Sequence, residues 1–216
     1  MKKAFLTSNL IPIITIVICC ILYLSGNFQM ITGGIIVLIA SAIEYKKDLF
    51  KSLGFQRDKF NIKNLLIIAP LVGAAIFLFY GYVMLPSITY LTEQPIDLSV
   101  FDPYKGNLTA CISLLAYIWA SAAFGEEIVF RGYLMRQFTK FFGSSTVSLV
   151  FNILLLGILF GYVHAYQGIS GQLLSGITGM FLAILFHFKK NDLWFNVAVH
   201  GFIDTVFVLF LYYGWI

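Results

Sequence analysis

Seven long apolar runs are the feature that most constrains how this chain of 216 residues can fold. The runs lie at about Leu10–Leu24, Phe28–Ile43, Leu65–Leu85, Leu108–Met135, Val147–Tyr166, Leu173–Phe188 and Leu193–Ile216. A helix needs roughly 20 mostly apolar residues to span a hydrocarbon core about 30 Å thick, and it satisfies its own backbone polar groups there. The sequence therefore predicts an all-α, polytopic transmembrane helix bundle of about seven helices. The second run is short, so it is either re-entrant or tilted.

The composition agrees with a membrane protein and argues against nucleic acid as a partner. The chain is 60% hydrophobic and only 11% charged, with a mean hydropathy of +0.89, whereas soluble domains carry about 25% charged residues. The net charge is +4, but the basic residues sit in short loops and form no continuous stripe. One bundle uses the whole length, so we expect a single domain, residues 1–216, whose surroundings are the lipid bilayer.

The distribution of basic residues predicts how the chain crosses the cell membrane. The loop Pro86–Gly106 is acidic and contains Lys105 as its only basic residue. If the N-terminus is cytoplasmic and seven spans follow, twelve Lys and Arg residues lie on the cytoplasmic side and one outside, with Arg131 set aside as buried. The positive-inside rule then predicts a cytoplasmic N-terminus and an external C-terminus.

Six ionisable residues interrupt three of the last four apolar runs and require a common explanation. Each costs at least about 2.5–3.5 kcal/mol on insertion scales, so such groups normally face a bundle interior and mark function. The six are Glu126, Glu127, Arg131, His164, His200 and Asp204.

The two adjacent glutamates are expected to play different parts. Glu127 and Arg131 are four residues apart, with the acid on the N-terminal side, which favours an ion pair on one helix face. Glu126 is rotated by about 100° from Glu127 and cannot share Arg131 as well. This pattern indicates a structural role for Glu127 and Arg131, and a chemical role for Glu126.

Helix lengths predict that Glu126, His164 and His200 meet at one depth. Glu126 precedes the turn between the fourth and fifth helices by about 17 residues and His164 follows it by about 20, so the two are level within about 5 Å. His200 lies about 15 Å into the last helix, and Asp204, four residues later, can accept a hydrogen bond from its ring. The predicted site lies towards the cytoplasmic half of the membrane.

This group of side chains can support peptide hydrolysis in two ways. A buried glutamate can take a proton from water while histidines position that water or protonate the leaving amine. Alternatively, Glu126, His164 and His200 can hold a zinc ion with a water in its open position. The residues do not distinguish the two mechanisms, so zinc is a possible cofactor only.

Three motifs in order resemble one known protein family. They read EEIVFR at Glu126–Arg131, FGYVH at Phe160–His164 and HGFID at His200–Asp204, matching the patterns EExxxR, FxxxH and HxxxN or HxxxD. The chain thus resembles the CPBP or Abi family of intramembrane proteases, which includes the type II CAAX prenyl endopeptidases and bacteriocin-processing proteins. The resemblance covers residues 108–208, and residues 1–107 are expected to be variable N-terminal helices and loops.

The resemblance implies an intramembrane endopeptidase that cleaves a membrane-associated or lipidated peptide or protein. By this resemblance, Glu126 activates a water molecule together with His164. His200 and Asp204 line the side of the oxyanion. The resemblance does not fix whether the substrate is prenylated.

The same resemblance implies that Glu127 and Arg131 hold the architecture. Asp204 stands where eukaryotic members carry asparagine, and an ionised carboxylate cannot donate a hydrogen bond to an oxyanion. Asp204 must therefore be protonated, orient His200 or bind a metal.

Two other classes of function are compatible with buried Glu and His residues. One is a non-catalytic membrane protein of the CPBP fold that acts as a bacteriocin immunity factor or scaffold. The other is a proton-coupled transporter, which predicts repeat-like halves with broken helices that the sequence does not display. The intact set of motif residues favours the enzyme.

Overall fold

The computed structural model describes residues 2–26 and 29–216, and these residues are helical or irregular, with no strand among them. The α-helices are α1 (Lys2–Leu24), α2 (Met30–Tyr45), α3 (Leu49–Leu53), α4 (Ala69–Phe79), α5 (Leu85–Thr92), α6 (Leu108–Ile118), α7 (Met135–Phe142), α8 (Thr146–Val163), α9 (Gly168–Phe188) and α10 (Leu193–Tyr212). Three π-helical segments are η3 (Asn64–Ile68), η4 (Tyr80–Met84) and η6 (Trp119–Leu134). Short 3₁₀ turns are η1 (Lys46–Asp48), η2 (Arg57–Lys59), η5 (Ser99–Tyr104) and η7 (Ala165–Gln167).

The predicted polytopic helix bundle is confirmed, with five helices long and apolar enough to cross a membrane among the described residues. They are Asn64–Thr92, Leu108–Phe142, Thr146–Val163, Ala165–Phe188 and Leu193–Tyr212. The first two apolar runs form the shorter helices α1 and α2, and Phe28, where the second run was expected to begin, lies outside the described residues. The expected seven helices therefore consist of five long ones and two whose apolar parts are short.

The third predicted helix is longer than its apolar run because it continues through Pro86. The sequence suggested that a loop begins at this proline, yet α5 extends to Thr92. Proline lacks an N–H and its ring crowds the preceding turn. The π-turn η4 immediately before α5 pairs carbonyls with residues five positions ahead, as the bond from the Leu85 N–H to the Tyr80 carbonyl shows. This wider turn accommodates the proline without ending the helix.

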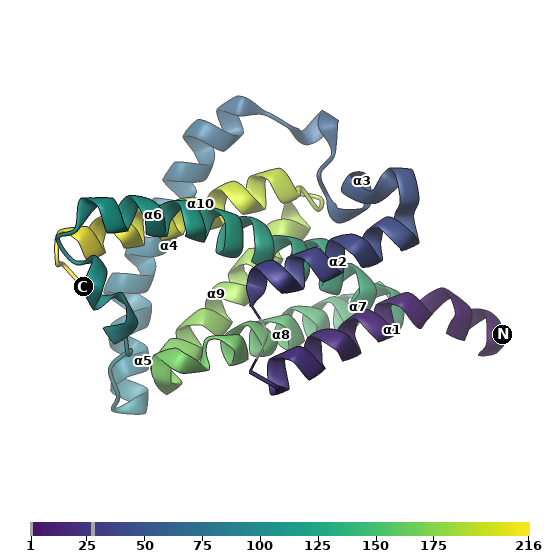
Figure 1. Cartoon of the computed structure of the whole chain (residues 1–216), viewed down its shortest axis with the longest axis horizontal. Coiled ribbons are helices and arrows are strands. Elements are labelled where there is room, and N and C mark those ends of the chain that lie inside the picture. Colours follow the sequence, from purple (N-terminus) through teal and green to yellow (C-terminus); the bar gives the residue numbers. More distant parts are fainter. Residues whose placement is uncertain (1, 27–28) are drawn as a thin grey trace.

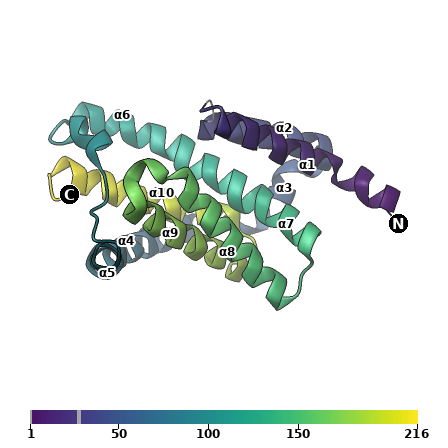
Figure 2. The same ribbon diagram turned by 90° about the horizontal axis from the view of Figure 1, so that it is seen from below.

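One long, rod-like helix is the central element of the bundle. α6, η6 and α7 run as a continuous helix, with α1 and α2 side by side against one flank and α8, α9 and α10 on the other (Figure 2). α10 packs between this rod and α4, and α8 packs along α9. The start of α1 and the end of α10 lie at opposite ends of the molecule (Figure 1).

Glycines bring α8 and α9 into backbone contact. A Cβ added at Gly161 would lie 2.5 Å from the Gln172 carbonyl oxygen, and one at Gly176 would lie 3.1 Å from the Gly157 carbonyl oxygen. Small residues allow such close approach between helices in lipid. The contact fixes the C-terminal end of α8, where His164 lies, against α9.

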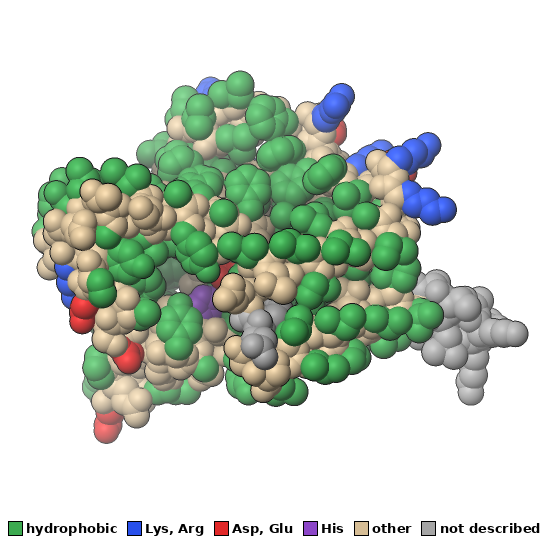
Figure 3. Space-filling view, viewed as in Figure 1, with side chains coloured by type: hydrophobic (Ala, Val, Ile, Leu, Met, Phe, Trp, Pro, Cys, Tyr) green, Lys and Arg blue, Asp and Glu red, His purple; other side chains and the backbone are tan. Residues whose placement is uncertain are grey.

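Charged side chains are unevenly distributed along the bundle. Figure 3 shows most Lys and Arg side chains at the end near α3, on the right, and most exposed Asp and Glu side chains at the opposite end. The hydrophobic side chains form the surface between these ends. This arrangement is typical of a multi-pass membrane protein, whose apolar belt faces lipid.

Candidate functional site

The carboxylate of Glu127 lies at the centre of a buried polar network. It is 0% exposed and receives three hydrogen bonds from charged or polar side chains. Oε1 accepts from Arg131 Nη1 and from His200 Nδ1, each at 2.9 Å. Oε2 accepts from Asn196 Nδ2 at 2.6 Å. Burying a carboxylate is costly unless it is paired and hydrogen-bonded, and these three donors meet that requirement.

Arg131 extends the network to α8 and α9. Its side chain is 1% exposed, and Nη2 donates to the Gly179 carbonyl oxygen at 2.9 Å. The guanidinium also lies over the Phe160 ring, 4.7 Å from the ring centre, as in a cation–π contact. One side chain of η6 therefore positions both neighbouring helices.

His200 is held with a defined orientation by Glu127. Because a carboxylate only accepts, the 2.9 Å contact assigns a proton to Nδ1 of the imidazole. Nε2 then faces two other acids, with Glu126 Oε2 at 3.9 Å and Asp204 Oδ2 at 3.7 Å. The imidazole thus lies among three carboxylates from two helices.

Glu126 and Asp204 each have a buried oxygen that accepts no hydrogen bond from the described residues, Oε2 and Oδ2 respectively. Glu126 as a whole is only 7% exposed. Both oxygens face Nε2 of His200 at distances too long for a direct hydrogen bond but suited to a bridging water. The three atoms define one position for a small polar molecule.

His164 lies at the end of α8, where the helix stops. Its Nδ1 donates to the Phe160 carbonyl oxygen at 2.8 Å, so in the neutral imidazole Nε2 is the acceptor. The ring stacks against Phe160 and Tyr166, with ring centres 4.9 Å and 6.0 Å apart. These contacts fix the tautomer and the plane of the ring.

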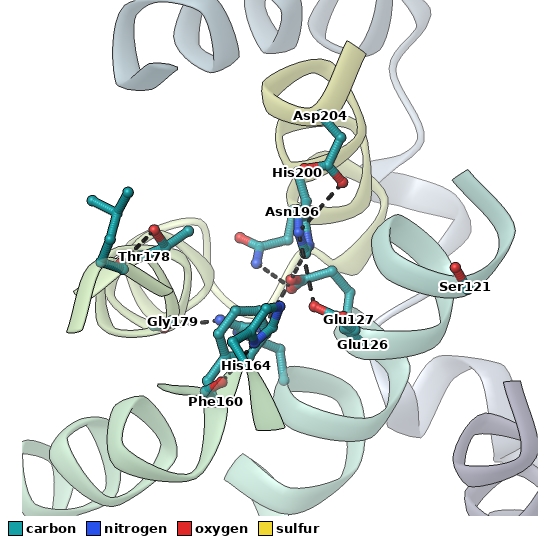
Figure 4. A network of polar contacts seen from close by, with 12 residues as sticks. Ser121, Glu126, Glu127, Phe160, His164, Thr178, Gly179, Asn196, His200 and Asp204 are labelled. Atoms are coloured by element: carbon teal, nitrogen blue, oxygen red, sulfur yellow. Dashed lines mark hydrogen bonds and ion pairs between the residues drawn. The ribbon is translucent and has the colours of Figure 1, made fainter. Parts of the chain in front are cut away.

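Figure 4 shows how side chains of three helices lie in one region. The participants are Glu126 and Glu127 of η6, His164 at the end of α8, and Asn196, His200 and Asp204 of α10. On the surface, Figure 3 shows a hollow between hydrophobic side chains in which a histidine and an acidic side chain are visible.

The predicted separation of the two glutamates agrees with this geometry. Glu127 pairs with Arg131, and Oε2 of Glu126 accepts no hydrogen bond from the residues that the structure describes. The hydrogen bond expected between His200 and Asp204 is not formed, since their nearest atoms are 3.7 Å apart and Glu127 takes Nδ1 instead. Asp204 therefore lies beside His200 without fixing its tautomer.

Asn196 is a site residue that sequence reasoning missed. It donates to Glu127 and also to the Leu182 carbonyl oxygen at 3.1 Å. The signal was its spacing, because Asn196, His200 and Asp204 follow one another at four-residue intervals and so share one face of α10.

The possible zinc set Glu126, His164 and His200 is not arranged as a metal site. Within residues 2–26 and 29–216, no three His, Cys, Asp or Glu side chains are grouped so that they could hold a metal ion. The hydrogen bonds of Nδ1 of His164 and Nδ1 of His200 leave only Nε2 of each ring open to a metal, and these nitrogens are not grouped with a third ligand among the described residues. The residues present thus do not fit a three-ligand zinc site in this arrangement.

Comparison with known families yields one finding. Residues 108–206 match the family described as Type II CAAX prenyl endopeptidase Rce1-like. Comparisons with curated proteins and with solved structures gave no match. The matched residues begin with α6 and end within α10, so they include all six ionisable side chains of the site.

Proposed function

Residues 108–206 are a domain of the Rce1-like type II CAAX prenyl endopeptidase family, and from this premise we propose that the protein is an intramembrane endopeptidase. It hydrolyses a peptide bond of a membrane-associated or lipidated peptide or protein. The observation that supports this most directly is the position of Glu126. Its buried Oε2, which accepts no hydrogen bond from residues 2–26 or 29–216, lies 3.9 Å from Nε2 of the His200 imidazole, which is itself oriented by Glu127.

In the proposed reaction Glu126 is the general base. A water molecule between Glu126 Oε2 and the histidines donates one proton to the carboxylate as its oxygen attacks the carbonyl carbon of the substrate. His164 accepts the second O–H of this water through Nε2, because Nδ1 already carries a proton. The C–N bond then breaks, and Glu126 returns the proton to the leaving amine. The charges and atoms balance without a further reactant.

In the proposed reaction His200 stabilises the oxyanion of the tetrahedral intermediate. When it is protonated, Nε2 donates to the oxygen that becomes negative in the tetrahedral intermediate, while Nδ1 stays bound to Glu127. The carboxylate of Asp204, with Oδ2 3.7 Å from Nε2, stabilises the positive charge of the protonated imidazole. Arg131 and Asn196 act only through Glu127, so they are positioning residues.

The proposed orientation places the N-terminus in the cytoplasm and the C-terminus outside the cell. Two features support it: the basic side chains gather at one end of the bundle, and the start of α1 and the end of α10 lie at opposite ends (Figures 1 and 3). Basic residues favour the cytoplasmic side of bacterial and other cell membranes.

The test is cleavage of membrane-anchored reporter peptides, with and without a prenyl group, by the purified full chain in liposomes. Glu126→Gln removes the base but keeps the size of the side chain, and a loss of at least about 10²-fold in kcat is expected. The control is Glu93→Gln, which changes an exposed glutamate of the loop after α5 and should leave the rate unchanged.

Two results would contradict the proposal. Equal cleavage by the wild type and Glu126→Gln would remove Glu126 as the base. Full function of Glu126→Gln in cells would favour the non-catalytic role as an immunity factor or scaffold. A chelator is expected to have no effect, so a loss of cleavage that zinc restores would replace the glutamate–water mechanism with a metal one.

A further inference from the structure

A cavity of ≈ 480 Å³ opens at the basic end of the bundle, away from the polar network of Glu127. Its lining residues come from α7, the turn to α8, the start of α8, the C-terminal end of α9 and the turn that follows α9. Its lining includes Arg136, Lys140, His187 and Ser144, and none of its lining residues is acidic. A volume of this size is typical of sites for small molecules.

Arg136 is a partly buried cation in the lining of this cavity. Its side chain is half-buried, and its buried Nε has no hydrogen-bond partner in the described part of the chain. Among the residues that the structure describes, no carboxylate lies within ion-pair distance of its guanidinium. Arg131, one turn earlier, differs because Glu127 and the Gly179 carbonyl occupy its guanidinium. A guanidinium that is partly removed from water favours a planar, anionic partner.

Other groups around the cavity add donors and an apolar wall. The ammonium of Lys140 is 3.1 Å from Glu44 Oε1 and remains partly exposed beside the cavity. Ser144 lies on the exposed turn before α8 and brings a hydroxyl. Leu149 and Phe186 supply apolar surface on the opposite helices. Positive donors next to apolar side chains suit a ligand with an anionic head and an apolar body.

The spans Leu108–Phe142 and Ala165–Phe188 end beside the cavity, and most basic side chains gather at the same end of the bundle, which places the cavity near a membrane surface. We propose that this cavity binds the phosphate of an anionic membrane lipid, with Arg136 as its principal contact. Basic pockets between transmembrane helices bind phosphate-bearing head groups for the same electrostatic reason. Free phosphate has the same anionic chemistry, but it would leave the apolar wall unused.

The experiment measures lipid binding by the purified full chain in detergent. Dioctanoyl phosphatidylglycerol, dioctanoyl phosphatidylcholine and inorganic phosphate are titrated separately, and Kd is obtained from the rise of the unfolding temperature. The wild type is expected to bind phosphatidylglycerol more tightly than either of the other two. Arg136→Gln is expected to weaken this binding roughly 10- to 100-fold, as the loss of charge-assisted hydrogen bonds predicts.

Matched variants separate a specific site from general attraction. Arg57→Gln removes the same charge from an exposed arginine of η2 and should bind phosphatidylglycerol like the wild type. Ser144→Asp places a negative charge beside the cavity and should also weaken phosphatidylglycerol binding. Because Ser144 lies on an exposed turn, this variant is expected to fold normally. It therefore tests the site even if Arg136→Gln does not fold. Glu126→Gln should bind lipid normally, so this inference does not depend on the proposed protease activity.

The proposal fails if Arg136→Gln or Ser144→Asp binds phosphatidylglycerol as tightly as the wild type. It also fails if inorganic phosphate stabilises the protein as strongly as phosphatidylglycerol, which would indicate a site for a soluble anion. Equal binding of phosphatidylcholine, whose phosphate is offset by a choline cation, would show that the site does not select a net anionic lipid and would overturn the proposal.

Discussion

Oε1 of Glu127 lies 2.9 Å from Arg131 Nη1 and also 2.9 Å from His200 Nδ1. A single oxygen therefore joins an arginine that fixes α8 and α9 to an imidazole of α10. The position of the imidazole depends on the ion pair, and the ion pair depends on the packing of the helices. Structure and proposed chemistry are therefore linked through this atom.

Arg131→Met should destabilise the protein far more than loss of an exposed ion pair. It leaves the fully buried Glu127 without its cation, at a cost of about 3–5 kcal/mol. The control is Lys105→Met, which breaks the exposed pair with Asp102 and should cost less than about 1 kcal/mol. Chemical unfolding in detergent measures both. Similar losses for the two variants would mean that the buried pair is not a structural support.

Asn196→Ala should reduce both stability and catalysis, because Asn196 acts through Glu127. Removing its amide leaves one oxygen of a buried carboxylate with a missing donor, which costs about 1–3 kcal/mol. We expect kcat to fall while KM changes little, since Asn196 does not reach the proposed substrate position.

The matched control for Asn196 is Asn152→Ala. Asn152 is also buried, but its amide donates to the Met135 carbonyl oxygen and to Thr139, away from Glu127. It should lose comparable stability and keep its kcat at temperatures where it is folded. If both variants lose the same fraction of kcat, Asn196 is merely a structural residue.

The importance of Asn196 was not predictable from the sequence, although the Glu127–Arg131 pair was. Four-residue spacing brings Glu127 and Arg131 together within one helix, so local geometry suffices to predict their contact. Asn196 contacts Glu127 from another helix, 69 positions away. Spacing shows that it shares a face with His200, but helix periodicity does not reveal which neighbour that face meets.

The backbone conformation of the site is a second feature that the sequence did not predict. The motif Glu126–Arg131 lies within the π-helical segment η6, whereas the sequence was interpreted with α-helical geometry. Residues with ordinary helix propensity can form either, and packing by neighbouring helices decides between them. The positions of the site residues along their helices were more predictable. Residue counts indicated that Glu126, His164 and His200 lie at a similar depth, and Figure 4 shows these side chains in one region.

Two aspartates outside the spans should respond to pH with opposite signs, and Asp192 is the first. It caps α10 by accepting from the Phe195 N–H, and its burial raises its pKa above the ordinary value. The stability linked to such an acid is present below the unfolded pKa, about 3.9, and is lost as pH rises through the folded pKa. Asp192→Asn keeps a capping oxygen without the charge, so its Tm should exceed that of the wild type at pH 7 and equal it near pH 4.

Asp97 provides the opposite case. Hydrogen bonds from the Ser99 hydroxyl and backbone N–H hold the pKa of Asp97 below its ordinary value. Its contribution to stability is present above the unfolded pKa and is lost as pH falls through the folded pKa. Asp97→Asn should therefore have a lower Tm than the wild type at pH 7, with the difference shrinking in acid. The same sign for both variants would contradict the assignment.

Gly161→Ala should separate α8 from α9 and displace His164, which lies three residues further on. The added Cβ would lie 2.5 Å from the Gln172 carbonyl oxygen and 3.2 Å from the Gly176 Cα, and neither backbone can move without shifting its helix. Overpacking of this kind costs about 1–3 kcal/mol, and kcat should fall with it. The control is Gly81→Ala, where nothing lies within 4 Å and alanine should stabilise the helix by about 0.5–1 kcal/mol. Unfolding assays measure the stability of both variants and cleavage assays measure their kcat. An unchanged kcat in Gly161→Ala would mean that the position of His164 does not depend on the α8–α9 contact.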